Sequence, residues 1–270
     1  MDVKNKGDLL NLEYLKKKTL HTPASQRFIE IDMLRGLAII LMIFGHLLWD
    51  LDYFGLMTIN GGIYSALQRS VQPMFFILVG ISLVVSKKKI ENLKSNDENK
   101  YYKRHILRGS KIFGIGMILT LLTLIFIPET PIYFGVLHCI GLSVILSAPF
   151  LKFRKFNLLF AFLILFASLV ISVYNLENPT IFHLILGIHQ TDIWNYTVDY
   201  FPLLPWFGIC LLGIVIGDCL YVGSERKFRL PDLSRFRSIK IFQWCGQHSL
   251  IIYLLHQPII AGAISILTKF

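Results

Sequence analysis

A histidine deep within an apolar segment near the start of the chain is the first candidate for chemistry. Between Asp32 and Asp50 the sequence has no Lys, Asp or Glu, but it holds Arg35 at the head of the run and His46 further along. A helix turns about 100° and rises about 1.5 Å per residue, so these two side chains share one face, about 16.5 Å apart along the axis. Asp50 follows His46 at i+4 and can reach the imidazole. A carboxylate on one ring nitrogen raises the basicity of the other, which predicts that His46 is a general base.

The same residues also have structural interpretations. Asp32 and Arg35 are three positions apart, which fits an ion pair at the membrane edge with the arginine extended toward water. His46 fits a histidine that is hydrogen-bonded between helices. Ionisable groups within a bilayer are costly and mark functional sites by default, and the carboxylate of Asp50 favours the catalytic interpretation of His46.

Polar residues on later apolar segments are candidates for the remaining parts of a site. Arg69 is expected near the depth of His46, where it would pair with Asp50 or Asp52, stabilise an oxyanion, or bind an acidic group of a substrate. No metal is expected, because the sequence has no motif with metal-ligand spacing. Four further side chains are candidate substrate contacts or polar packing residues: Gln72, His138, His256 and Gln257.

A group of basic residues lies at the start of another apolar segment. Arg104, Arg108 and Lys111 occupy positions i, i+4 and i+7, which puts them on one helical face. Arginine makes bidentate contacts with phosphates, so this face is a candidate phosphate binder. The alternative is that these residues only mark the cytoplasmic side of a membrane helix.

The composition indicates which elements hold these residues. Of 270 residues, 54% are hydrophobic and 16% charged, and the mean hydropathy is +0.58. A soluble domain carries nearer a quarter charged residues, and crossing a bilayer takes about 20 apolar residues. The sequence therefore predicts an all-α polytopic membrane protein. Seven spans are expected, near residues 33–51, 64–86, 106–127, 134–151, 156–175, 202–221 and 247–267. In the sixth, Gly213 and Gly217 form a small-xxx-small pair, which predicts close helix packing.

The charges of the loops predict the orientation. Lys and Arg fall in the segment before the first span and in every second loop, and the first, third and fifth loops carry none. By the positive-inside rule the N-terminus is expected in the cytoplasm and the C-terminus outside the cell membrane. Residues 1–30 are then a basic cytoplasmic lead-in, and 31–270 form one transmembrane domain. The net charge of +10 follows this alternation, so membrane lipids are expected partners and nucleic acid is not.

The opening segment and three later ones resemble one family. The stretch RFIEIDMLRGLAIILMIFGHLLWDLDYFG is similar to the start of the heparan-α-glucosaminide N-acetyltransferase catalytic-domain-like family of prokaryotic membrane proteins, and more broadly to the transmembrane acyltransferase superfamily. Arg35 and His46 match the signature of that superfamily, an arginine followed by ten residues and a histidine. The resemblance covers nearly the whole chain beyond residue 25, because GVLHCIG, FPLLPWFGICLLG and GQHSLIIYLLHQPII also look like that family.

The resemblance implies a reaction and roles for several residues. It implies that His46 is the catalytic residue and that cytoplasmic basic residues bind acyl-CoA, here Arg35, Arg104, Arg108 and Lys111. The implied reaction moves an acetyl or acyl group from acetyl-CoA to a hydroxyl or amine of an extracytoplasmic glycan or small envelope metabolite. In the animal lysosomal enzyme the active histidine is assigned to the loop after the first span, but this loop, LDYFGLMTINGG, has no histidine here. The resemblance therefore supports acyl transfer more strongly than it supports glucosamine as the acceptor.

Two other classes of function remain open on the sequence. A transporter or flippase for a small metabolite would use Arg69, His138 and His256 to line a polar path. The sequence has no visible internal repeat, which counts against an inverted-repeat transporter, and so does the spacing of Arg35 and His46. A seven-span sensor or scaffold would leave the polar groups near His46 unexplained. As an assembly, a homodimer is considered beside the monomer.

Overall fold

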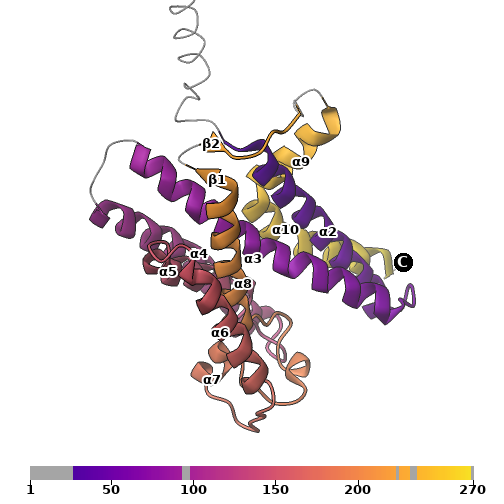
Figure 1. Ribbon diagram of the computed structural model, residues 1–270. Helices are drawn as coiled ribbons and strands as arrows, with labels where there is room; N and C mark the ends of the chain where they lie inside the picture. Colours follow the sequence, from indigo (N-terminus) through magenta and orange to yellow (C-terminus); the bar gives the residue numbers. More distant parts are fainter. Residues whose placement is uncertain (1–26, 93–97, 223–224, 232–235, 269–270) are drawn as a thin grey trace, which may run out of the picture.

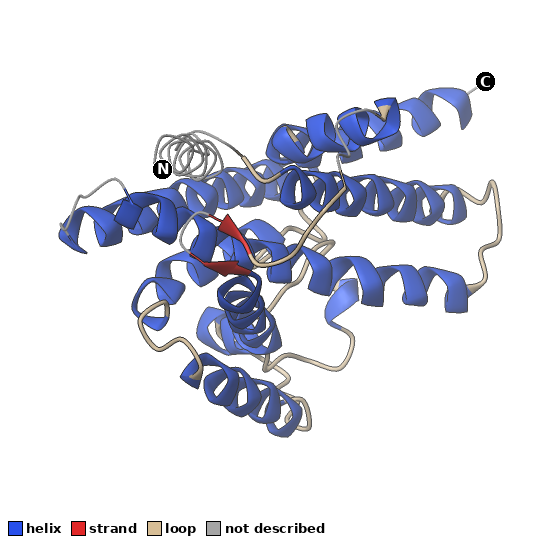
Figure 2. Ribbon diagram, turned by 45° about the horizontal axis from the view of Figure 1, so that its top comes forward, coloured by secondary structure: helices blue, strands red, loops and turns tan. Residues whose placement is uncertain are grey.

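The computed structural model describes residues 27–92, 98–222, 225–231 and 236–268. The predicted lead-in therefore lies outside the described residues except for 27–30. Helices make up most of what is described (Figure 2). In chain order the elements are α2 (Ile29–Tyr53), α3 (Gly61–Asn92), α4 (Glu98–Phe126), α5 (Val136–Phe150), α6 (Phe156–Ile171), α7 (Ile181–Leu186), the 3-10 helix η1 (Ile193–Asn195), α8 (Leu203–Leu220), β1 (Tyr221–Val222), β2 (Glu225–Arg226), α9 (Arg237–Gln247) and α10 (Ser249–Thr268).

Each of the seven predicted spans coincides with one helix. Among the described residues, five helices are long and apolar enough to cross a membrane: α2, α3, α4, α8 and α10. The other two, α5 and α6, are apolar but have 15 and 16 residues. The chain is thus a multi-pass membrane protein with an almost all-α fold, as predicted, whereas the count of seven spans and their orientation stay predictions.

Several short elements were not predicted. The helix α9 has the sequence RSIKIFQWCGQ, which is too polar and too short to stand out as a span. It presents Ile241 and Trp244 outward and packs on α2 with its other face. The strands β1 and β2 have two residues each and form an antiparallel hairpin after α8. Elements of this length carry too few residues for a hydrophobic period to be read.

The helix α3 connects two groups of helices. It packs on α2 on one side and on α8 on the other. The first group consists of α2, α9 and α10, and the second of α4, α5, α6 and α8. Figure 1 shows α2, α3 and α10 running together toward the C-terminus, whereas α6, α7 and α8 extend in another direction. The largest buried cluster lies between α3 and the second group and includes Phe76, Leu211 and Ile214.

Glycines allow two pairs of helices to approach closely. A Cβ at Gly213 would lie 2.3 Å from the Ile77 carbonyl oxygen of α3, and Gly217 also faces that helix. The predicted packing role of this glycine pair is confirmed. At the crossing of α2 and α9, a Cβ at Gly36 would lie 1.8 Å from the Phe242 carbonyl oxygen. In a bilayer, close backbone approach replaces much of the hydrophobic driving force between helices.

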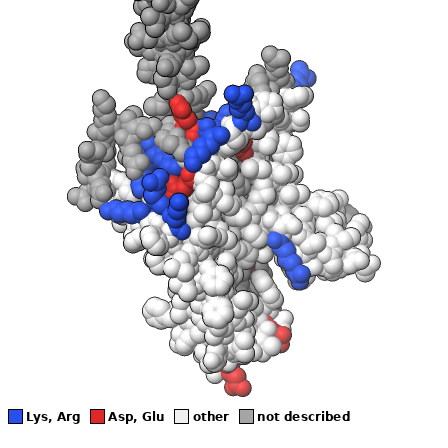
Figure 3. All heavy atoms as spheres, in the orientation of Figure 1, with Lys and Arg blue, Asp and Glu red and all other residues white. Residues whose placement is uncertain are grey.

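Basic side chains gather at one end of the molecule. Figure 3 shows most of the visible Lys and Arg near the N-terminal end of α2, with some acidic side chains among them and others at the opposite end. At the basic end, Glu30 of α2 accepts hydrogen bonds from Arg226 Nε and Nη2 at 2.7 and 2.8 Å, and from the Tyr221 hydroxyl at 3.0 Å. This bidentate pair fixes the start of α2 to the β1–β2 hairpin.

We expect Gly36→Ala to destabilise the protein. The added methyl group would collide with the backbone of α9, so the helices must separate, at a cost of about 1–3 kcal/mol in the free energy of unfolding. Gly262→Ala in α10 is the matched control, because a Cβ there meets nothing within 4 Å. It should leave stability unchanged or raise it by up to about 1 kcal/mol. Thermal unfolding of the purified protein in detergent measures both, and equal midpoints would refute the close contact.

Candidate functional site

Two histidines from the first and last long helices face one another. The ring centroids of His46 in α2 and His256 in α10 are 4.9 Å apart, and His256 is 8% exposed. The Nδ1 atom of His256 lies 2.6 Å from the Tyr253 carbonyl oxygen. A carbonyl only accepts hydrogen bonds, so Nδ1 carries the proton and Nε2 is left as an acceptor. Within the described residues this buried Nε2 has no hydrogen-bond partner.

The partner of Asp50 differs from both partners that the sequence suggested. Its carboxylate is 1% exposed and accepts two hydrogen bonds from Gln257 Nε2, at 3.0 and 3.1 Å. The described residues contain no hydrogen bond between Asp50 and His46, although their i+4 spacing would allow one. The reason is the position of α10, which brings an amide to the carboxylate and a second imidazole to His46. Asp50 therefore joins α2 to α10 rather than orienting His46 directly.

Arg69 and Gln72 do not converge on this pair. Arg69 is exposed, and in the part of the chain that the structure describes it forms no ion pair or hydrogen bond. The predicted ion pair with Asp50 or Asp52 is therefore not formed; Asp52 instead accepts a hydrogen bond from the Ile59 N–H at 3.1 Å. Gln72 is half-buried. Roles for Arg69 and Gln72 in substrate binding stay predictions.

At the basic end of α2, the predicted ion pair of Arg35 is confirmed. Arg35 Nη1 donates to Asp32 Oδ1 at 3.0 Å, and Nη2 donates to the Ser82 hydroxyl of α3 at 2.8 Å. Asp32 Oδ2 also accepts a longer hydrogen bond, 3.4 Å, from Gln247 of α9. The guanidinium has five N–H donors and its side chain is 26% exposed, so it retains donors for an anion.

One arginine of α4, Arg108, lies in the electrostatic field of Arg35. Arg108 experiences electrostatic repulsion from both Arg35 and Arg104, which joins three of the four predicted phosphate binders into one field. Lys111 is exposed farther along α4. His105, which the sequence did not single out, is buried behind these residues with Nδ1 3.0 Å from the Tyr101 carbonyl oxygen. Several close like charges are favourable only when an anion is near, so the cluster fits a phosphate-bearing ligand.

His138 is held on both ring nitrogens by its own part of the fold. Its Nδ1 accepts a hydrogen bond from the Gly135 N–H at 3.2 Å, and its Nε2 lies 3.3 Å from the Thr120 hydroxyl. The ring is 1% exposed and packs edge-on against Phe113. This arrangement favours the structural interpretation of His138, which caps the start of α5.

Two polar residues near His256 were missed by the sequence analysis. Asp199, in the loop before α8, accepts hydrogen bonds from the Val136 N–H at 3.0 Å and from the Tyr253 hydroxyl at 3.5 Å. Tyr253 lies three residues before His256, and their ring centroids are 5.6 Å apart. The sequence does not single out Asp199, because its partners come from helices far away in the sequence. Burial raises the pKa of the Asp199 carboxyl to about 6, against the opposing effect of these two hydrogen bonds.

Comparison with protein families gives a match that covers both histidines. The family model described as heparan-alpha-glucosaminide N-acetyltransferase, catalytic, matches residues 27–258, which is most of the chain. The chain belongs to this family. No characterised protein in the curated comparison and no solved structure matches the chain. As a member of this N-acetyltransferase family with several membrane-length helices, the protein is a membrane acetyltransferase.

The match to the N-acetyltransferase family includes the whole candidate site. It runs from Arg27, just before α2, to Pro258 in α10, so it contains Arg35 and His46 of α2 and the part of α10 that faces His46. Among the described residues, no group of three or more His, Cys, Asp or Glu side chains is arranged to hold a metal ion. The groups available for chemistry are the facing imidazoles, the Asp50–Gln257 pair and the arginine cluster.

We expect the protein to be less stable when the hydrogen-bond donor to Asp50 is removed. Gln257→Leu would leave a buried carboxylate without its hydrogen bonds, which lowers the free energy of unfolding by about 1–3 kcal/mol. The double variant Asp50→Leu/Gln257→Leu should lose less than the sum of the single changes. Gln72→Leu is the matched control, since the described part of the chain gives this half-buried glutamine no hydrogen bond. Chemical or thermal unfolding in detergent tests this, and additive losses would argue against the pair.

The raised pKa of Asp199 predicts a pH dependence of stability. A carboxyl in an unfolded chain has a pKa of about 3.9. A folded-state pKa of about 6 therefore gives stability that is complete below about pH 4 and is lost as the pH rises through about 6. Between pH 4 and 7 the wild type should lose about 1–3 kcal/mol relative to Asp199→Asn, which cannot titrate. Parallel pH profiles of unfolding for the two proteins would show that this carboxyl titrates normally.

Proposed function

We propose that the protein transfers an acetyl or other acyl group from cytoplasmic acyl-CoA to an extracytoplasmic acceptor, with His46 as the general base. The observation that carries the proposal is the facing pair of His46 and His256 in a chain from an N-acetyltransferase family. Among the described residues, one buried imidazole nitrogen of this pair, His256 Nε2, has no hydrogen-bond partner. An imidazole pair of this kind can take a proton, hold it and return it within one reaction.

The donor side of the proposal rests on the arginine cluster. Arg35 keeps guanidinium donors beside Asp32 and Ser82, and Arg108 is repelled by both Arg35 and Arg104. Phosphates of acyl-CoA would occupy this field at the cytoplasmic end. Arg35 and His46 are eleven residues apart on α2, about 16.5 Å along the axis. An extended pantetheine arm along this face would bring the thioester to the imidazole.

The chemical step follows from the position of the base. An acceptor hydroxyl or amine gives its proton to His46 as its oxygen or nitrogen attacks the thioester carbonyl carbon. The new C–O or C–N bond forms, the C–S bond breaks, and the thiolate of CoA takes the proton from the His46 imidazolium. His256, whose Nδ1–H is held by the Tyr253 carbonyl, offers Nε2 to the His46 N–H or to the acceptor. A route through an acetylated His46 uses the same groups.

The acceptor side of the proposal lies beyond His256. Tyr253 and Asp199 continue the polar groups from α10 to the loop before α8, which is predicted to be outside the membrane. Hydroxyl, amide and carboxylate groups of this kind bind polar acceptors such as a glycan or a small envelope metabolite. The proposed location is the cell membrane, with donor and acceptor on opposite sides.

We expect two variants to separate the donor site from the base. Arg35→Gln should raise the KM for acetyl-CoA by about tenfold, because a charge-assisted contact with phosphate is lost, and change the KM for the acceptor little. His46→Ala should lower kcat by a factor of about 10²–10⁴ and leave the KM for acetyl-CoA nearly unchanged. Steady-state transfer, or hydrolysis of acetyl-CoA, measures both.

His248→Ala is the control for the loss of a histidine. This residue contacts Trp244 at the junction of α9 and α10 and is outside the proposed site. Its variant should keep the wild-type rate. A wild-type kcat in His46→Ala, or an Arg35→Gln effect that falls equally on both substrates, would count against the proposal.

A further inference from the structure

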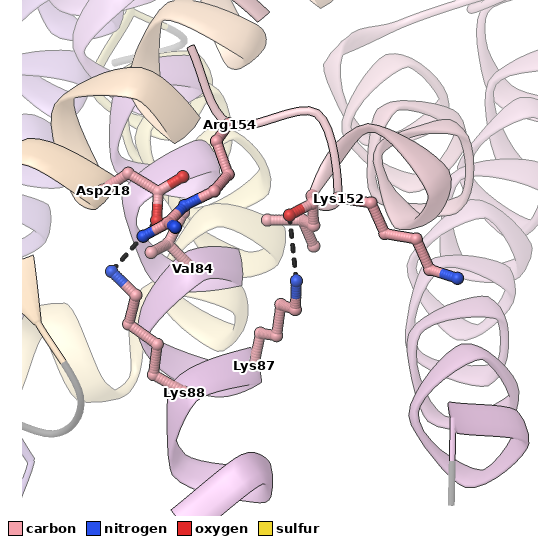
Figure 4. Close-up of a pocket in the computed structure, with 7 residues that line it drawn as sticks. Val84, Lys87, Lys88, Lys152, Arg154 and Asp218 are labelled. Carbon is pink, nitrogen blue, oxygen red and sulfur yellow. Dashed lines mark hydrogen bonds and ion pairs between the residues drawn. The ribbon is translucent and has the colours of Figure 1, made fainter. Parts of the chain in front are cut away.

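A second basic site lies at the ends of α3 and α8, beside the turn that joins α5 to α6. It is a cavity of about 260 Å³, much larger than the roughly 30 Å³ that one water occupies in the liquid (Figure 4). None of its lining residues is an arginine of the cluster around Arg35. The lining residues are Val84, Lys87, Lys88, Leu151, Lys152, Arg154 and Asp218.

The cavity carries an excess of positive charge. Its lining has four basic residues, but Lys152 directs its ammonium group away, over the Tyr102 ring. The one carboxylate, Asp218, forms an ion pair with Lys88 at 3.0 Å. Lys88 also donates to the Tyr221 carbonyl oxygen, and Lys87 donates to the Leu151 carbonyl oxygen at 2.9 Å. These bonds hold two ammonium groups at the wall from the end of α3, as Figure 4 shows. The walls are therefore built by contacts between elements rather than by mobile surface lysines alone.

Arg154 is the basic residue of the cavity whose charged group is least involved in holding the fold together. In the described residues its guanidinium has no hydrogen bond or ion pair, and the residue is exposed. Its φ of 43° lies in the left-handed region, where glycine is favoured over residues with a Cβ. The chain thus has a long cationic side chain at a position whose backbone suits glycine.

The height of the cavity in the bundle indicates which anions can reach it. Lys88 ends a membrane-length apolar segment of α3, and Asp218 lies two residues before the end of the apolar helix α8. The cavity is therefore at the level where a membrane helix meets water, on the side with basic loops. Basic pockets between membrane helices at this level bind phosphate-bearing head groups.

We propose that this cavity binds a phosphate group, with Arg154 as the residue that contacts it from the outer rim. The phosphate can belong to the head group of an anionic lipid or to a soluble phosphate compound. Arginine supplies a bidentate fork and lysine a point charge for such a ligand. The site is separate from the proposed donor and base residues, so it does not depend on the protein being an acyltransferase.

The test is ligand-induced stabilisation of the full-length protein in detergent. The midpoint of thermal unfolding is titrated with dihexanoyl phosphatidic acid, dihexanoyl phosphatidylcholine, inorganic phosphate and ADP. Phosphatidic acid, or the two soluble phosphates, should raise the midpoint of the wild type. Arg154→Gly should weaken the apparent affinity about fivefold.

Arg154→Gly is informative because it should lower the affinity for phosphate without lowering the stability of the unliganded protein. Glycine relieves the left-handed conformation, so the unliganded variant should unfold at the wild-type temperature or above it. The matched control Lys103→Gln/Lys155→Gln removes two nearby positive charges that do not line the cavity, and should keep the affinity within twofold.

The ligand arms separate the two sources of phosphate. Stabilisation that Arg154→Gly weakens assigns the cavity to a lipid head group if phosphatidic acid alone gives it, and to a soluble compound if phosphate and ADP give it. Stabilisation that Arg154→Gly leaves unchanged comes from the arginine cluster and contradicts the proposal. The proposal is overturned if no phosphate compound stabilises the wild type, or if the control weakens binding as much as Arg154→Gly. Neither result depends on acetyl transfer, which is measured separately.

Discussion

A buried carboxylate is stable only with a hydrogen-bond donor beside it, and the arrangement of the site depends on the donor that Asp50 has. Its oxygens are almost inaccessible and accept both hydrogen bonds from the Gln257 amide. Without that amide the carboxylate would lose more than the bond itself, because a buried acceptor cannot return to water. His46 lies one turn before Asp50 on α2, and His256 directly precedes Gln257 on α10. One contact therefore fixes the depth of α10 against α2 and brings the two imidazoles face to face.

The opposite end of α2 is fixed by different forces. Glu30 is bound by a bidentate arginine from the β hairpin, and Gly36 lets the backbone of α9 approach α2. Arg35 lies between these contacts with its guanidinium on Asp32 and Ser82. The helix is thus held at both ends while its central face carries the residues proposed for the reaction. Fixing both ends of α2 suits a catalyst that binds a donor at one end of the helix and must hold a base in place further along it.

The sequence predicts the features that depend on local periodicity. The seven apolar segments coincide with helices, the ion pair of Asp32 and Arg35 follows from i,i+3 spacing, and Gly217 packs against α3 as a small-xxx-small residue should. Choices between partners from different helices could not be predicted. Asp50 had a local candidate at i−4, but the position of α10 decided its partner. Asp199 is of the same kind, because its contacts come from two helices that only the fold brings together.

Chemical rescue of a single turnover tests most directly whether His46 acts as the base. Acetyl-CoA is mixed with an excess of His46→Ala protein and acceptor, and the first turnover is followed with and without added imidazole. The account predicts a slow turnover that imidazole accelerates, because a small base can enter the space beside His256 and take the acceptor proton. Arg35→Gln, which keeps the histidine, should gain nothing from imidazole. A wild-type turnover by His46→Ala without imidazole would contradict the account.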